Sequence, residues 1–309
     1  MMNESDVYSA SLERLSLEAK RTFYRRSQRH RLNILSGYVC LFVPWLLYLV
    51  IYSLTSFHAY YTHPDLCIFF VAIIGIGILW LGAYALSRLY RKASGSEDHE
   101  PNWWAFLFLT CSAAWVCGLI FGLLNFWTNM QPYYSFLDME EYPEVNPATT
   151  HGRQVMDAGI VHWSNTTTLD LKHSMGFKNS DTYCVAPITM DNLALDSYDF
   201  WAVGLGCCSS NANDFQCGEY RKRGSLQGLR MLRDEDRAFY RLAITQAEAA
   251  YQIRATHPLL FYWVEDAHAE MYNFRNMGYR YCLIGMIAHL GWQMLCVALA
   301  MMSFSKRMV

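Results

Sequence analysis

Four long apolar stretches constrain this chain more than any other feature. The hydrocarbon core of a bilayer is about 30 Å thick, so a spanning helix needs about 20 mostly apolar residues. Each stretch reaches that length, and none carries Asp, Glu, Lys or Arg in its interior. The stretches are Ile34–Phe57, Cys67–Leu86, Trp103–Trp127 and Tyr281–Phe304.

These stretches predict a membrane α-helical four-span bundle with a large α+β extracytoplasmic domain between spans three and four. The predicted order is a cytosolic basic segment 1–32, spans 33–57 and 67–87, a cytosolic loop 88–102, span 103–127, the domain 128–278, span 279–304 and a cytosolic tail 305–309.

The distribution of charge predicts the orientation. Lys and Arg are retained on the cytosolic side of short loops and span ends. The first 32 residues hold seven of them, whereas the segment 128–278 has 12 basic and 19 acidic residues, a net charge of −7. We therefore expect both termini in the cytosol. The plasma membrane or a secretory-pathway membrane is favoured, with an organellar membrane as the alternative. The net charge of the whole chain is only −2, which gives no indication of a nucleic-acid partner.

The segment 128–278 reads as strands followed by helices. Residues 130–152 are rich in Pro and acid, which predicts irregular structure. Helical spacing begins behind the acidic cluster Asp234–Asp236 and is expected to end at His257-Pro258, since the residue before proline avoids the helical region. A second helix is predicted over Leu259–Met277. The predicted strands are Gln154–Trp163, Thr166–Leu171, Thr182–Ile188 and Tyr198–Cys208.

Four of the ten cysteines lie in this segment: Cys184, Cys207, Cys208 and Cys217. An even number in an oxidising compartment predicts two disulfides. Neighbouring cysteines rarely pair with each other, so Cys207 and Cys208 are each expected to bond to Cys184 or Cys217. Free structural thiols and a metal site are the alternatives, although zinc motifs separate paired cysteines by two to four residues.

A glycosylation acceptor sequence, Asn165-Thr166-Thr167, lies in the same segment. If the chain enters the secretory route, it predicts a glycan at Asn165 on the surface.

The spans carry little chemistry. His289 is the only titratable residue at depth in them, apart from cysteine and tyrosine, and Gln293 follows one turn later. The pair predicts either part of a polar path or, as we favour, hydrogen bonds between packed helices. Small residues at helical spacing predict close packing, within the chain or against a partner helix. They are Ala114, Gly118 and Gly122 on span three and Gly285, Ala288 and Gly291 on span four.

The sequence matches no known catalytic motif, phosphate-binding loop or cofactor-binding motif. Glu265 and His268 have the spacing of half a di-iron motif, but no second pair accompanies them. His162, His173 and His257 are scattered in sequence. We therefore predict no cofactor or resident metal, and an enzyme remains the less favoured reading.

The layout resembles that of the tetraspanins: four spans, a small first loop, and a large loop before span four that holds a Cys-Cys pair. Here Ser209 follows the pair and Cys184 precedes it. The phrases SMGFKNSDTYCVAPI, DFWAVGLGCC, FQCGEY and FYRLAITQAEAAYQIRATHPLLFYW resemble an uncharacterised group of multi-span membrane proteins of algae and other protists. The tetraspanin resemblance implies an organising role, and the second implies no activity.

The sequence predicts an integral membrane scaffold that contacts the lipid bilayer and binds a membrane or extracytoplasmic protein, or a second copy of itself. One alternative is a sensor whose domain binds a small ligand or glycan through aromatics such as Phe200 and Trp201. Others are an accessory subunit of a membrane complex and a membrane-bound enzyme.

Overall fold

A computed structural model describes residues 34–94, 103–191, 193–209, 213–222 and 224–306, with side chains up to residue 303. The predictions for the segment 1–32, for most of the loop 88–102 and for the end of the tail lie outside these residues. The chain forms two compact units, which are described separately below. One is the membrane unit, residues 1–126 with 279–309, and the other is the α+β domain, residues 127–278.

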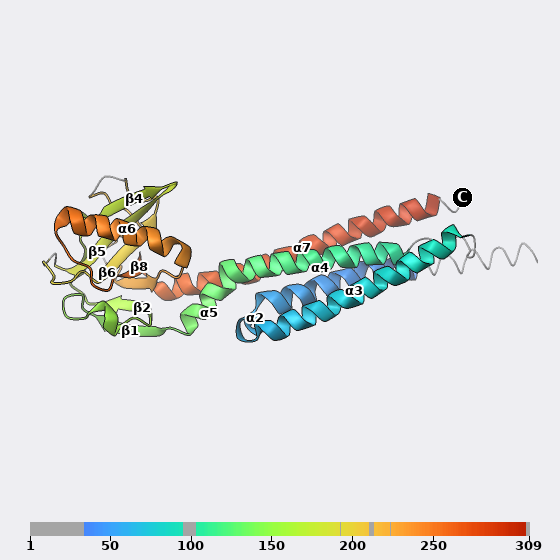
Figure 1. The fold of residues 1–309 in the computed structure, drawn as a ribbon, viewed down its shortest axis with the longest axis horizontal. Coiled ribbons are helices and arrows are strands. Elements are labelled where there is room, and N and C mark those ends of the chain that lie inside the picture. Colours follow the sequence, from blue (N-terminus) through green and yellow to red (C-terminus); the bar gives the residue numbers. More distant parts are fainter. Residues whose placement is uncertain (1–33, 95–102, 192, 210–212, 223, 307–309) are drawn as a thin grey trace, which may run out of the picture. The chain divides into compact units, whose positions relative to one another are not determined.

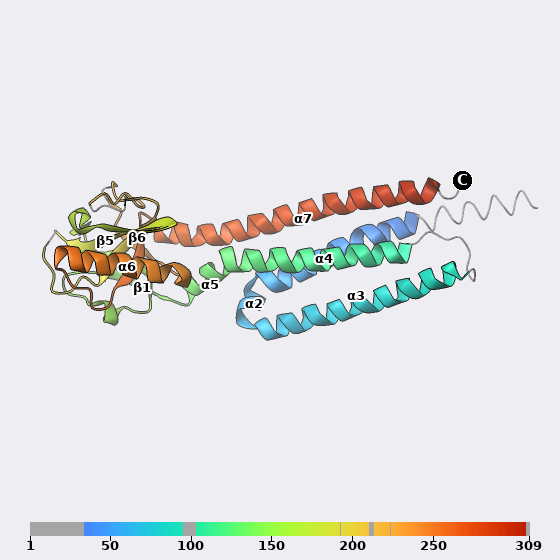
Figure 2. The same ribbon diagram turned by 45° about the horizontal axis from the view of Figure 1, so that its top comes forward.

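In the part of the chain that the structure describes, four helices are long and apolar enough to cross a bilayer, which confirms the predicted spans (Figures 1 and 2). They cover Ile34–Ser56, Pro64–Ala93, Trp103–Leu137 and Ala267–Ser303. The second is α3 (Pro64–Ala93), which follows the short α2 (His58–Thr62). The third joins α4 (Trp103–Asn125), a π-helical turn (Phe126–Met130) and α5 (Gln131–Leu137). The fourth is the continuous helix α7 (Ala267–Lys306).

Hydrogen bonds link the spans in pairs. Gln293 Nε2 of α7 donates a hydrogen bond to the backbone carbonyl of Cys40 in the first span, at 2.6 Å. Trp45 of the first span donates to the backbone carbonyl of Met286 in α7, at 3.1 Å. Other bonds join α3 to α4 and the first span to α4, namely Trp115 Nε1 to the carbonyl of Val71 and Asn125 Nδ2 to Ser56 Oγ. In hydrocarbon, where no water competes, such bonds fix how helices pack.

The α+β domain is built on one mixed eight-stranded sheet in the order β1-β2-β7-β8-β6-β5-β3, with β4 paired to β5. The pairs β1·β2 and β6·β8 are parallel, and the others are antiparallel. The strands are β1 (Glu140–Val145), β2 (Ala158–Trp163), β3 (Thr167–Leu169), β4 (Met175–Asn179), β5 (Asp181–Met190), β6 (Phe200–Leu205), β7 (Gln227–Arg230) and β8 (Leu259–Val264).

The two faces of the sheet are covered differently. Side chains alternate along β6, so Trp201 and Phe200 point to opposite faces. Trp201 packs in the cluster that includes the apolar side of α6 (Asp234–Tyr251). Phe200 packs with Trp163 and Phe261 in a second cluster that contains no helical residue and is closed by loop residues such as Phe215. Figure 1 shows α6 lying along the sheet.

Several predictions for the domain are corrected by the structure. The segment predicted to be irregular contains α5 and β1; β1 reads EEYPEV, and an edge strand tolerates the charge and proline that a central strand excludes. The helix predicted over Leu259–Met277 begins instead at Ala267, after β8. The LLFYWV run of β8 is too short for its pattern to separate strand from buried helix.

Helix α6 also ends earlier than predicted, at Tyr251. Gln252 adopts a left-handed conformation with φ 57°, and the carboxylate of Glu248 accepts a hydrogen bond from the backbone of Ala255. The chain therefore turns away six residues before the proline. The strand predictions over Gln154–Trp163, Thr182–Ile188 and Tyr198–Cys208 contain β2, part of β5 and β6.

Candidate functional site on the α+β domain

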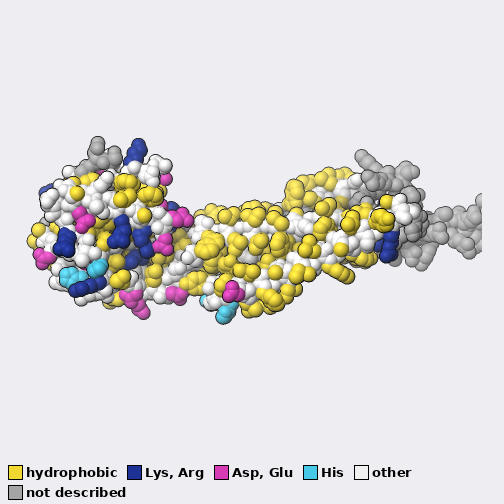
Figure 3. All heavy atoms as spheres, viewed as in Figure 1, with side chains coloured by type: hydrophobic (Ala, Val, Ile, Leu, Met, Phe, Trp, Pro, Cys, Tyr) yellow, Lys and Arg dark blue, Asp and Glu magenta, His cyan; other side chains and the backbone are white. Residues whose placement is uncertain are grey.

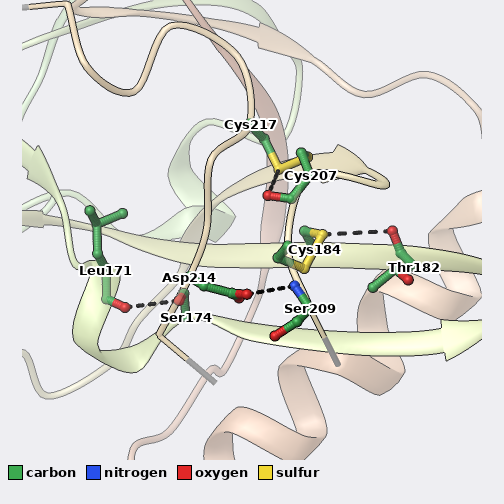
Figure 4. Close-up of a disulfide and its surroundings, with 9 residues drawn as sticks. Leu171, Ser174, Thr182, Cys184, Cys207, Ser209, Asp214 and Cys217 are labelled. Carbon is green, nitrogen blue, oxygen red and sulfur yellow. Dashed lines mark hydrogen bonds between the residues drawn. A yellow bond between two sulfur atoms is a disulfide. The ribbon is translucent and has the colours of Figure 1, made fainter. Parts of the chain in front are cut away.

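The long connection from β6 to β7, residues 206–226, is the most unusual feature of the domain, and we call it the anchored loop. Its described residues form neither helix nor strand. Two disulfides hold its first half: Cys184–Cys208 and Cys207–Cys217 (Figure 4). Of the two pairings that sequence left open, the structure has this one.

The pairing follows from the register of the sheet. Cys184 lies on β5 between Gly176 of β4 and Gly204 of β6, which are its partners in the two neighbouring strands. A Cβ at Gly176 would lie 2.9 Å from Cys208 Sγ, and one at Gly204 would lie 2.6 Å from Cys207 Sγ. The two glycines therefore leave the space that the sulfur atoms occupy.

Hydrogen bonds fix the loop further. Asp214 accepts from the backbone of Ser209 at 2.7 Å (Figure 4), and Tyr251 of α6 donates to Asn213 Oδ1 at 3.1 Å. Phe215 is buried in the core, while Ser209, Asn213 and Gln216 are exposed. The described residues of the loop thus pack Phe215 into the core on one face of the sheet and leave polar side chains exposed.

The second half of the loop is held by ion pairs. Lys222 Nζ lies 2.6 Å from Glu219 Oε1 and 2.7 Å from Glu265 Oε2. The hydrogen bond from Lys222 lowers the pKa of Glu219 below its ordinary value. Beside them, the guanidinium of Arg221 stacks over the ring of Tyr220 at 5.2 Å. The carboxylate of Glu265 therefore forms an ion pair with Lys222. Because α7 starts at Ala267, Glu265 lies outside the helix that carries His268, and the two residues do not share a helical turn.

A second polar cluster, which the sequence did not reveal, joins three elements. One carboxylate oxygen of Glu141 in β1 accepts a hydrogen bond from His162 of β2 and another from His268 of α7. This oxygen, Oε1, lies 2.7 Å from His162 Nε2 and 3.0 Å from His268 Nε2. These hydrogen bonds, led by that from His162, lower the pKa of Glu141. The only signal in the sequence was the histidines themselves, because Glu141 lies in a segment predicted to be irregular.

Asp199 forms a buried carboxylate site before β6. It accepts hydrogen bonds from Ser197 Oγ and from the backbone N–H groups of Gly152, Thr256 and His257. Burial raises the pKa of Asp199, but these bonds outweigh it, so the pKa is lowered overall. The site ties the segment before β8 to β6 and is saturated by its own chain.

The aromatics proposed for ligand binding are core residues. Phe200 is 1% exposed and Trp201 0%. Both side chains pack in the hydrophobic clusters on the two faces of the sheet, so neither offers an exposed surface to a ligand. The prediction that they form a binding site is wrong.

In the membrane unit, the small residues of span three pack against the first span. A Cβ at Gly118 would lie 3.1 Å from Ile51 and one at Gly122 would lie 2.0 Å from Thr55 Oγ1, and Ala114 is fully buried. The stripe on span four differs. Of its residues, Gly285 contacts Tyr48, while Ala288 and Gly291 are exposed.

Both residues of the intramembrane polar pair contact the first span, and the predicted interhelical hydrogen bond is present at Gln293 but not at the buried Nδ1 of His289, which has no hydrogen-bond partner among the described residues. Gln293 donates to the first span, as described above, and the ring of His289 stacks on Tyr48 with centroids 4.4 Å apart. Figure 3 shows hydrophobic side chains covering the spans and charged side chains concentrated over the α+β domain. No described contact extends the pair into a chain of polar groups.

Asn165 lies in an exposed turn between β2 and β3. The second threonine of its acceptor sequence, Thr167, is buried at the start of β3, where its hydroxyl bonds to Ser164 Oγ at 2.9 Å. Asn165 itself, in the turn, is exposed to solvent.

Comparison of the sequence with protein-family models, curated proteins and solved structures found no match. The fold and site nevertheless define a class: this is a four-span membrane protein with a disulfide-containing α+β domain between its third and fourth spans. The resemblance to tetraspanins in layout stays a prediction.

Proposed function

We propose that this protein is a membrane-anchored binding protein whose anchored loop, residues 206–226, docks a partner protein. One observation carries the proposal: the described residues of this connection, 206–209, 213–222 and 224–226, form no helix or strand and are held by two disulfides, by the hydrogen bond at Asp214 and by the ion pair at Lys222. Structureless connections beyond about 12–15 residues are uncommon in compact domains and are usually either functional or disordered linkers, and the bonds named above favour the functional explanation. Binding to loop residues that are already held in place avoids the entropic cost of ordering them.

The exposed chemistry of the loop suits a protein partner. Arg221 and Lys222 are exposed, and Tyr220 lies half-buried under the guanidinium of Arg221. Tyrosine and arginine are the residues that most often dominate protein–protein binding energy, since each offers a large contact area and hydrogen-bonding groups. The small-ligand sensor loses its support because Phe200 and Trp201 are buried.

The proposed orientation places the α+β domain outside the cytosol, with both termini inside and the chain in the secretory route. The asymmetric Lys and Arg distribution supports it. So do the two disulfides, which persist in oxidising compartments, and the exposed Asn165. An accessory subunit of an organellar complex is the alternative, and it predicts a bare Asn165.

The test is comparative capture from native membranes with the full chain in mild detergent. A partner held by the loop should be recovered in stoichiometric amount and should be lost in the double variant Tyr220→Ala/Arg221→Ala. Arg241→Ala, an exposed arginine on α6, is the matched control and should retain it.

Self-association gives a stable oligomer of the wild type that the double variant loses. A wild-type chain that elutes as a monomer without partners would end the proposal. Equal capture by both variants would exclude the anchored loop as the docking surface.

A further inference from the structure

We infer that Glu141, His162 and His268 form a binding site for a divalent transition-metal ion of the zinc type. Their three ligand atoms lie within 4.8 Å of one another. They belong to separate parts of the chain, since His268 lies 127 positions from Glu141. This inference stands apart from the anchored loop and does not depend on the proposed function.

Backbone structure holds all three residues in place. Glu141 and His162 lie on neighbouring parallel strands, β1 and β2. His268 lies in the first turn of α7, next to Ala267, which is fully buried and donates its N–H to Gln227 Oε1 of β7 at 2.8 Å. Sites built on strands and helices hold their ligands more closely than sites on loops, because the backbone cannot shift freely.

The donor set selects the class of ion. Imidazole nitrogen favours zinc, copper, nickel and iron, whereas magnesium and calcium take oxygen ligands. Two histidines with one carboxylate, leaving a position for water, is a recognised zinc arrangement. The exposed fractions of the side chains, 29% for His162, 42% for His268 and 45% for Glu141, leave a path from solvent.

Metal binding requires the three ligand atoms to take up a common spacing. With bonds of about 2.0–2.1 Å in tetrahedral geometry, ligand atoms lie about 3.3 Å apart. The Glu141 oxygen now lies 2.7 Å and 3.0 Å from the two Nε2 atoms, so these distances open by about 0.6 Å and about 0.3 Å, and the two histidine nitrogens, which lie within 4.8 Å of each other, take up the same spacing. Each Nε2 then gives its lone pair to the ion, so the ring proton resides on Nδ1 and any second proton is released to solvent.

A bound ion would join the edge strand β1, the strand β2 and the first turn of α7. Helix α7 continues into the fourth span, so the bound ion would hold the first turn of that helix to the two strands.

The test is zinc binding to the full chain in detergent micelles, purified without a histidine tag and freed of metal with a chelator. A chromogenic chelator in competition reports affinity and stoichiometry, and Co²⁺ in place of Zn²⁺ reports tetrahedral coordination through its visible absorption. The wild type should bind one equivalent. Glu141→Gln, His162→Gln and His268→Gln should each weaken binding by about tenfold or more.

His257→Gln is the matched control, because His257 is an exposed histidine of the same domain outside the cluster. Its affinity should match the wild type. Zinc should also raise the melting temperature of the wild type and of the control, but not that of the three variants, whose metal-free melting temperatures and near-ultraviolet circular dichroism show whether they fold.

No saturable binding by the wild type up to about 100 μM Zn²⁺ overturns the inference. Binding that the three folded variants retain also overturns it, since the ion would then lie elsewhere.

Discussion

Removing the Cys184–Cys208 disulfide should destabilise the α+β domain by an amount set by the length of chain that it closes. The bond joins residues 24 apart, and Cys207–Cys217 joins residues 10 apart. The loop-closure entropy of the unfolded chain then gives about 3.4 kcal/mol for the first bond and about 2.7 kcal/mol for the second. For a domain of this size these values correspond to a fall in melting temperature of about 7–14 °C and about 5–11 °C.

The variants are Cys184→Ala/Cys208→Ala and Cys207→Ala/Cys217→Ala. Alanine is used because Cys184 is fully buried, and a serine hydroxyl there would lack a partner. The assay is a thermal ramp of the full chain in detergent with a brief protease pulse at each temperature. Cleavage within residues 127–278 reports unfolding of the domain separately from the spans.

Two controls test the pairing. Cys184→Ala alone should cost as much as the double variant, because it already breaks the same bond, whereas Cys184→Ala/Cys217→Ala breaks two bonds and should cost more. A thiol reductant should lower the melting temperature of the wild type and leave the fourfold alanine variant unchanged. Shifts under about 2 °C would refute the reasoning. A crossed pair that costs no more than a matched pair would refute the connectivity.

Three further outcomes are expected. Gly122→Val should destabilise the spans by about 1–3 kcal/mol in a detergent melting assay, because its side chain meets Thr55 of the first span, whereas Gly77→Val faces open space and should be neutral. Asp199→Asn should cost about 1–3 kcal/mol at neutral pH, measured by urea unfolding. Because the pKa of Asp199 is lowered by folding, its stabilisation of the folded state is present above about pH 4, the ordinary range of an aspartate, and is lost as pH falls through the lower folded pKa. The free energy of unfolding of the variant should therefore fall less steeply with acid than that of the wild type, and equal pH dependence would contradict this. Asn165→Gln should remove a mass increment on gels, and an unchanged mobility would favour an organellar location.

The sequence by itself determined the spans and the class of the domain. Bilayer thickness sets how many consecutive apolar residues a helix needs, so the property is local and is read from composition. The helical spacing of α6 and the strand at Tyr198–Cys208 are equally local patterns. The boundaries between helices and strands were harder to predict, since the six-residue run of β8 fits either a strand or a buried helix.

The tertiary structure decided what depends on pairing between distant segments. The sequence offered two disulfide arrangements, and the register that places Cys184 between Gly176 and Gly204 selects one. No sequence pattern joins His162 to His268. Only the parallel pairing of β1 with β2 and the contact of α7 with β7 bring both histidines to one oxygen of Glu141. Local propensity carries no information about which strands become neighbours, because neighbours are chosen by the burial of the whole sheet.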